Sequence, residues 1–168
     1  MKKTVLILLT ILLLVACTAS GTSNTVVFVD PNAVQAGAYG SLGFRANEYQ
    51  FGIYDPTKEV FEHITSSGTF ADVSCAFEGE DTYYFFNGFE IMANVIDGEE
   101  RVTAINLLDD TVKTPDGLYI GMSAAELNSI LGTSLIEDGL HTEIDGTAQR
   151  NITVVDGTVR AISYLPAN

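Results

Sequence analysis

Hydrophobic and polar positions follow a helical period most clearly between Gly121 and Gly132, in the stretch GMSAAELNSILG. The apolar positions recur at helical spacing and form one face: Leu127, Ile130 and Leu131. Ser123 followed three residues later by Glu126 is the pattern of a capping box at the helix start. Gly132 can end the helix in the left-handed conformation. The pattern therefore predicts a short amphipathic helix with a defined start and end.

A second helix is predicted in the stretch DPTKEVFEHITS, residues 55–66. Asp55 can cap this helix, and Pro56 can occupy its first position, where the missing N–H has no helical partner. The apolar stripe consists of Val60, Phe61 and Ile64.

Most of the remaining chain has the pattern of antiparallel hairpins. Asn87-Gly88 separates the apolar runs of YYFFNGFEIM, and Asp156-Gly157 does the same in RNITVVDGTVRAISYL. Both dipeptides are strong short-range hairpin signals. Many turns and few helices predict an α+β fold, an antiparallel sheet with two helices packed on one face.

An internal repeat supports this architecture. VTAINLL at residues 102–108 and VRAISYL at residues 159–165 share the same residue at four of seven positions. Each copy follows a turn with an Asp-Gly pair and lies downstream of one predicted helix. We expect two helix-then-strands repeats, about residues 49–114 and 115–168, side by side in one sheet. Chance similarity is the alternative, because strands use a restricted set of residues.

The helix motif Gly121-Met122-Ser123, Glu126-Leu127 and Leu131-Gly132, followed by strands, resembles the repeated unit of the beta-lactamase-inhibitor-protein-like fold. Small outer-membrane assembly lipoproteins share that unit. The resemblance implies an α+β repeat whose curved sheet grips other proteins, but it does not imply inhibition of a β-lactamase. The stretches SCAFEGEDTYYFFNGFEI and DDTVKTPDGLYIGMS also look like a group of uncharacterised lipoproteins of Gram-positive gut bacteria, over residues 49–132.

The start of the chain has the pattern of a targeting segment. Lys2 and Lys3 precede the apolar run Thr4–Ala16, which is shorter than the roughly 20 residues that a membrane-spanning helix needs. Leu14-Val15-Ala16-Cys17 resembles the lipobox of bacterial lipoproteins. The resemblance implies cleavage before Cys17, lipidation of its thiol and an extracytoplasmic protein anchored to the bacterial cell membrane. A buried N-terminal helix and ordinary secretion with a free Cys17 are the alternatives.

These boundaries divide the chain into three parts. Residues 1–16 form a signal peptide, and residues 17–41 form a lipid-anchored arm or linker. Residues 42–168 form a single α+β domain, which agrees with the size of the remaining chain.

The charge of the chain restricts its partners. With 22 Asp and Glu against 8 Lys and Arg, the formal net charge is −14. Because affinity for nucleic acid comes largely from Lys and Arg on phosphate, we expect no nucleic-acid partner. Solubility accounts for such a charge, and a cationic partner or calcium is the more specific interpretation.

The sequence offers no clear reaction, and we expect no enzyme activity and no cofactor. Ser123 lacks the second glycine of a nucleophile elbow, and the histidines are His63 and His141. Calcium could bind Asp109, Asp110 and Asp116, or Glu78, Glu80 and Asp81, although no EF-hand loop is present and we predict no metal site. Cys75, between acidic residues, is expected to be a small buried side chain without a disulfide.

The aromatic hairpin carries the best candidate for a binding site. A two-residue turn at Asn87-Gly88 puts alternate side chains on opposite faces. The uniformly apolar set, expected in the core, is Tyr84, Phe86, Phe89 and Ile91. The mixed set is Tyr83, Phe85, Glu90 and Met92. If helices cover only the first face, the second faces solvent or a partner, unless the arm at Val26–Val29 covers it.

These observations predict a binding module that recognises an unknown envelope or extracellular protein through Tyr83, Phe85 and Met92. An envelope hydrolase with an unrecognised site and a calcium-responsive structural surface lipoprotein are the alternative functions.

Overall fold

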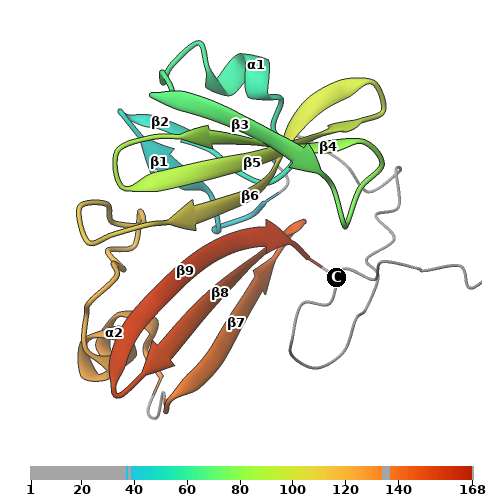
Figure 1. Cartoon of the computed structure of the whole chain (residues 1–168). Coiled ribbons are helices and arrows are strands. Elements are labelled where there is room, and N and C mark those ends of the chain that lie inside the picture. Colours follow the sequence, from blue (N-terminus) through green and yellow to red (C-terminus); the bar gives the residue numbers. More distant parts are fainter. Residues whose placement is uncertain (1–36, 38, 134–136, 168) are drawn as a thin grey trace, which may run out of the picture.

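The computed structural model describes residues 37, 39–133 and 137–167 (Figure 1). Cys17, the predicted signal peptide at residues 1–16 and the Val26–Val29 segment lie outside these residues. The described elements follow the order β1 (Phe44–Ala46), β2 (Tyr49–Phe51), α1 (Thr57–Val60), β3 (Gly68–Val73), β4 (Glu80–Phe85), β5 (Phe89–Ile96), β6 (Glu99–Leu107), α2 (Ala124–Leu131), β7 (Gly139–Asp145), β8 (Ala148–Val155) and β9 (Thr158–Pro166).

Seven strands form one antiparallel sheet in the order β3-β4-β5-β6-β9-β8-β7, and β1 and β2 form a separate hairpin (Figure 1). Strands dominate the described chain, so the expected α+β class holds only in a broad sense. The element order is a helix followed by β3–β6, then a helix followed by β7–β9. The two sets of strands meet at β6 and β9, where Ile105 pairs with Tyr164 and Asn106 with Ser163.

The residues that lead into each helix contact the sheet in the same way in both halves. Val102 in β6 and Val159 in β9, which occupy the same position of the sequence repeat, each exchange two backbone hydrogen bonds with the segment before a helix. These bonds are Tyr54 N to Val102 O (2.7 Å), Val102 N to Asp55 O (3.0 Å), Gly121 N to Val159 O (2.8 Å) and Val159 N to Met122 O (2.9 Å). Tyr54 and Gly121 both have a positive φ, 72° and 97°. The correspondence therefore extends from sequence to backbone conformation.

A β-bulge also recurs at one repeat position. On β6, Val102 pairs with Ala93 of β5 and Ala104 pairs with Met92. Thr103, between them, has no pairing partner on β5. On β9, Arg160 lies between Val159 and Ala161 and likewise has no pairing partner on β8. Bulges increase the local twist of a sheet, so both halves bend at corresponding places.

The core lies on one face of the sheet, and the β1–β2 hairpin covers much of it. The Phe44 ring, fully buried, lies 5.0 Å from Phe89 of β5 and 5.9 Å from Tyr164 of β9, measured between ring centroids. The helices contribute little to this core, mainly Val60 from α1 and Leu127 from α2. The structure therefore does not show the sheet face packed with helices that the sequence predicts.

The two helices agree with the sequence to different degrees. In α2, Ser123 and Glu126 form the expected capping box, and Gly132 ends the helix with φ 65°. α1 is shorter than expected, and its N-cap is Pro56, without a side-chain cap. The prediction that Asp55 caps α1 is wrong, because its carboxylate accepts hydrogen bonds from the N–H groups of Gly37 and Gly52 instead.

The packed chain begins before the expected boundary at Leu42. The Tyr39 ring lies so close to Gly52 that a Cβ at residue 52 would come within 2.4 Å of it. Burial is the largest cause that raises the pKa of Tyr39 to about 12, and the negative charge of Asp55 is the second largest. The backbone N–H and the hydroxyl of Ser41 both donate to Asp145, at 2.8 Å.

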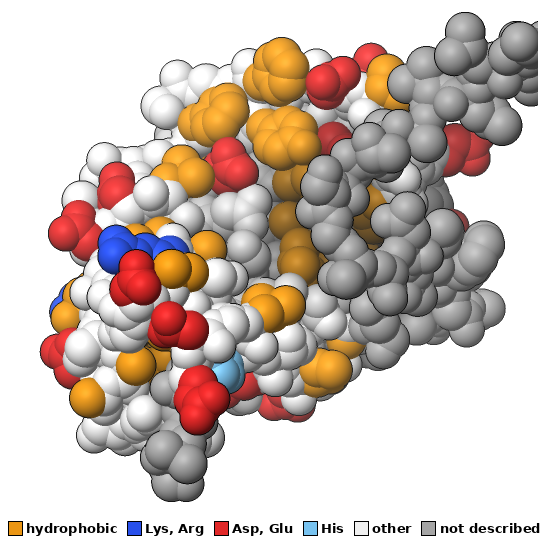
Figure 2. Space-filling view, turned by 60° about the horizontal axis from the view of Figure 1, so that its bottom comes forward, with side chains coloured by type: hydrophobic (Ala, Val, Ile, Leu, Met, Phe, Trp, Pro, Cys, Tyr) orange, Lys and Arg blue, Asp and Glu red, His pale blue; other side chains and the backbone are white. Residues whose placement is uncertain are grey.

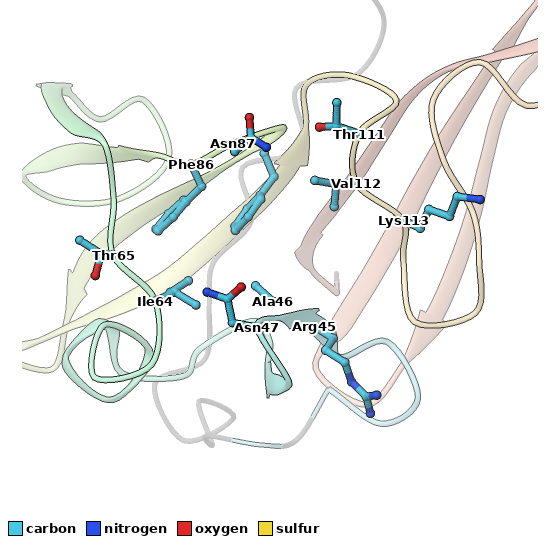
Figure 3. A pocket seen from close by; sticks show the side chains of 11 residues that line it. Arg45, Ala46, Asn47, Ile64, Thr65, Phe86, Asn87, Thr111, Val112 and Lys113 are labelled. Carbon is cyan, nitrogen blue, oxygen red and sulfur yellow. The ribbon is translucent and has the colours of Figure 1, made fainter.

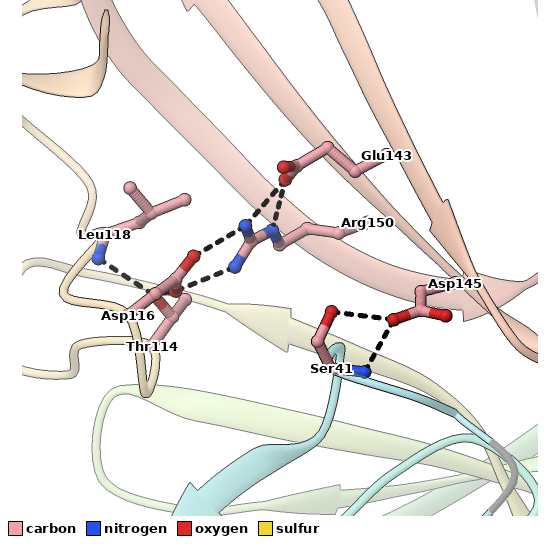
Figure 4. A network of polar contacts seen from close by, with 7 residues as sticks. All are labelled: Ser41, Thr114, Asp116, Leu118, Glu143, Asp145 and Arg150. Atoms are coloured by element: carbon pink, nitrogen blue, oxygen red, sulfur yellow. Dashed lines mark hydrogen bonds and ion pairs between the residues drawn. The ribbon is translucent and has the colours of Figure 1, made fainter. Parts of the chain in front are cut away.

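A buried arginine joins strands β7 and β8 to the loop before α2 (Figure 4). Arg150 in β8 donates to Asp116 through two nitrogens, at 2.8 and 2.7 Å, and to Glu143 of β7 at 2.7 Å. Thr114 also donates to Asp116. Burial alone would raise the pKa of Asp116, but the hydrogen bonds from Arg150 and Thr114 outweigh it and lower that pKa. The charged form of Asp116 is therefore favoured in the folded protein.

The lowered pKa predicts a pH-dependent contribution of Asp116 to stability. A depressed carboxyl pKa stabilises the fold above the ordinary pKa near 3.8 and ceases to do so as the pH falls through the folded-state value. We expect Asp116→Asn to cost about 1–2 kcal/mol at pH 7, because bonds to charged groups contribute this much and water still reaches the carboxylate. Urea unfolding at pH 7 and pH 3 should show the difference narrowing at pH 3. The exposed Asp110→Asn variant is the control, and an equal difference at both pH values would contradict the prediction.

Candidate functional site

A row of mostly apolar side chains crosses the sheet on the face opposite the core. Strand register pairs Phe70 of β3 with Tyr83 of β4, Tyr83 with Met92 of β5, and Met92 with Ala104 of β6. Across the β6–β9 junction, where Ile105 pairs with Tyr164, the next residue Leu165 of β9 lines the same cavity as Met92. We call these five residues the open-face row, within which Ala104 is buried.

The structure divides the aromatic hairpin between two faces as the alternation predicts. Phe89 and Ile91 are buried in the core, and Tyr84 and Phe86 pack against it. Tyr83 and Met92 belong to the open-face row and are half-buried. Phe85, also half-buried, lies beside the row, opposite Gly68 and Glu90. Whether residues 26–29 cover this face lies outside the described part of the chain.

Sequence reasoning missed the two ends of the row. Phe70 is 55% exposed on the edge strand β3, and Leu165 follows from the C-terminal strand. The repeat between residues 102–108 and 159–165 was the signal for Leu165, because it suggested that the two strands share one sheet. Nothing in the sequence around Phe70 indicated its pairing with Tyr83.

A cavity of about 280 Å³ lies beside Met92 and Leu165 of the open-face row. Its lining includes Phe77, Met92, Thr103, Gln149, Leu165 and Pro166. Phe77 comes from the loop between β3 and β4, where the Ser74 hydroxyl accepts the Phe77 N–H at 2.9 Å and shapes the turn. Figure 2 shows one side of the molecule, where hydrophobic side chains gather with acidic side chains beside them.

The same loop corrects the expectation for Cys75. Its side chain is exposed, whereas the sequence suggested a buried residue. The physical reason is that Cys75 lies in the turn that carries Phe77, one residue after Ser74, rather than on the core face of a strand.

Acidic neighbours surround Tyr83. Burial raises the pKa of Tyr83 most, and the charges of Asp81, Glu90 and Asp72 raise it further. The phenol therefore stays neutral at physiological pH and can donate a hydrogen bond. A ligand at the row meets apolar surface with negative charge beside it.

The residues considered for catalysis have separate local contacts. The His63 ring stacks on Tyr49 at 3.8 Å, and the His141 Nε2 lies 2.7 Å from the Glu137 carbonyl oxygen. Ser123 belongs to the cap of α2. No contact among the described residues joins two of these three side chains.

The acidic loops do not assemble a metal site within the described residues. No group of three or more His, Cys, Asp or Glu side chains there could hold an ion. Asp116 pairs with Arg150, Asp109 accepts from Thr111, and Asp81 accepts from Asn94. No described helix is long and apolar enough to cross a membrane.

Comparison with known proteins gives no match to any family model, curated protein or solved structure.

The two faces of the sheet should respond differently to substitution. Phe70→Thr should change the free energy of unfolding by less than about 1 kcal/mol, because Phe70 is largely exposed and threonine suits a strand. Ile91→Ala on the core face should cost about 2–5 kcal/mol, because it removes fully buried methyl and methylene groups. Urea denaturation of both variants measures these changes in the free energy of unfolding. A loss at Phe70 as large as that at Ile91 would show that the row is covered and part of a core.

Proposed function

We propose that this chain is a lipid-anchored, extracytoplasmic binding module that recognises a protein partner through the open-face row. The proposal describes a non-catalytic protein whose lipid, on Cys17, holds the sheet near the bacterial cell membrane. The observation that carries it is the apolar row from Phe70 to Leu165, with a cavity at the end formed by Met92 and Leu165.

The chemistry of the row suits a protein partner. Aromatic residues and methionine are enriched at recognition surfaces, and rigid aromatic side chains often dominate binding energy. Phe70 and Tyr83 are such side chains, with ring centroids 6.2 Å apart. The 280 Å³ cavity beside Met92 could take one apolar side chain of the partner.

The charge around the row favours a particular kind of partner. Asp72, Asp81 and Glu90 act on Tyr83, and the whole chain has a net charge of −14. A surface that offers an apolar anchor surrounded by Lys or Arg would be complementary, while anionic lipids and nucleic acids would be repelled.

Membrane anchoring rests on the sequence of the leader. The apolar run Thr4–Ala16 and the lipobox Leu14-Val15-Ala16-Cys17 support cleavage and lipidation at Cys17. Two or more acyl chains bind a bilayer stably, and confinement to the membrane raises the effective concentration for an envelope partner.

The finer architecture is part of the same proposal. We infer that the two helix-then-strands units descend from one duplicated unit of the beta-lactamase-inhibitor-protein-like kind. The matching hydrogen bonds of Val102 and Val159, and the bulges at Thr103 and Arg160, support the duplication.

Lipidation can be tested on the full-length chain expressed in a bacterium. We expect the chain to incorporate an alkyne-labelled fatty acid and to sediment with membranes. Cys17→Ser should abolish the label, whereas Cys75→Ser should retain it, because only Cys17 lies in the lipobox. Equal labelling of parent and Cys17→Ser would contradict the anchor.

Recognition through the row can be tested by photo-crosslinking in cells. Benzoylphenylalanine placed at Phe70 should give a discrete protein adduct, because this side chain lies at the exposed end of the row. The same group at Ile130, 42% exposed on α2, is the matched control. Tyr83→Ser should weaken the adduct at position 70 several-fold while circular dichroism remains unchanged. No adduct at position 70, or the same adducts at both positions, would argue against this face.

A further inference from the structure

A second pocket, of about 440 Å³, lies away from the open-face row (Figure 3). Four separate segments build it: residues 45–47 at the β1–β2 turn, residues 64–65 after α1, residues 86–89 at the β4–β5 turn, and residues 111–113 after β6. Its volume falls in the range of small-molecule sites.

Aromatic and aliphatic side chains line one part of this pocket. Phe86 and Phe89 stack with a centroid distance of 4.6 Å and an interplanar angle of 5°. Ile64 and Val112 add aliphatic surface. In Figure 3 the Phe86 ring points into the space between these segments. A flat or short apolar group is therefore the part of a ligand that this interior fits.

The charged lining differs from that of the chain as a whole. Arg45 and Lys113 line the pocket and no carboxylate does, although Asp and Glu outnumber Lys and Arg by 22 to 8 in the sequence. Figure 3 shows both cations on the same side, across from Ile64 and Thr65. A pocket of equal volume beside α1 is more acidic, since its lining has three glutamates and one lysine: Glu59, Glu62, Glu99 and Lys58.

The polar groups of the pocket are available to a ligand. Among the described residues, the side chains of Arg45, Asn47 and Asn87 make no hydrogen bond or ion pair with one another or with the rest. Lys113 lies over the Tyr119 ring, 4.6 Å from its centroid. In Figure 3 the Lys113 ammonium group and the Arg45 guanidinium point away from the interior, so both charges lie at the rim of the pocket. The Asn47 amide points toward Ile64 in Figure 3.

Close packing holds the walls in place. At Gly88, a Cβ would come within 2.3 Å of the Thr111 hydroxyl and 2.6 Å of a Val112 methyl group. The Leu108 N–H also donates to the Gly88 carbonyl at 2.8 Å. The Asn-Gly turn therefore serves a second purpose, because only glycine lets the 111–113 wall approach it.

We propose that this pocket binds a small amphipathic carboxylate, with its apolar body against Phe86 and Phe89 and its anionic end at the rim that carries Arg45 and Lys113. The site is independent of the partner surface proposed above, because it shares no residue with the open-face row. Charge complementarity selects the carboxylate, and the stacked rings favour an aromatic or short aliphatic body.

The test compares 4-phenylbutanoate with its neutral amide, 4-phenylbutanamide, by equilibrium dialysis against the full-length chain. The two probes share one apolar body and differ in charge. We expect the carboxylate to bind at least fivefold more tightly than the amide at low salt. The double variant Arg45→Gln/Lys113→Gln should remove this preference while leaving amide binding unchanged, because both side chains are exposed and lie at the rim.

Lys58→Gln/Arg160→Gln is the matched control, with the same change of net charge at exposed sites outside the pocket. It should retain the carboxylate preference. Phe86→Ala should weaken both probes equally, with the fold verified by circular dichroism. The proposal is overturned if neither probe binds at millimolar concentration, if both bind alike, or if the control variant loses the preference as fully as the pocket variant.

Discussion

The two halves of the seven-stranded sheet meet along a junction of two registered residue pairs between β6 and β9. Such a short ladder contributes few hydrogen bonds, so the packing beneath it has to hold the halves together. Phe44 provides that packing, because its ring contacts Phe89 in one half and Tyr164 in the other. The β1–β2 hairpin thus precedes both units in the chain and joins them in space.

The sequence predicted best the features that depend on residues close together in the chain. The cap of α2 depends on Ser123 and Glu126, three residues apart, and the aromatic hairpin depends on one turn. The repeat between residues 102–108 and 159–165 also carried long-range information, because both copies lie at the central junction. The helix layer was overestimated, since short helical patterns were expected to cover a face that the β1–β2 hairpin largely occupies.

The errors and omissions arise where distant segments compete for the same group. Asp55 has the sequence pattern of a cap, but Gly37 and Gly52 provide donors that no local pattern reveals. The β1–β2 turn was missed because Asn47 and Glu48 adopt positive φ without a glycine to mark them. Phe70 and Leu165 join the candidate surface only through strand order, and four segments are needed to form the pocket with Arg45 and Lys113.

The open-face row crosses the junction between β6 and β9, with Met92 on one side and Leu165 on the other. A molecule that contacts both residues would bridge the ladder with the fewest registered pairs in the sheet. Its binding energy would then add to the cohesion of the two halves, through ordinary linkage between binding and folding. Recognition of a partner and the cohesion of the two halves would then depend on the same residues.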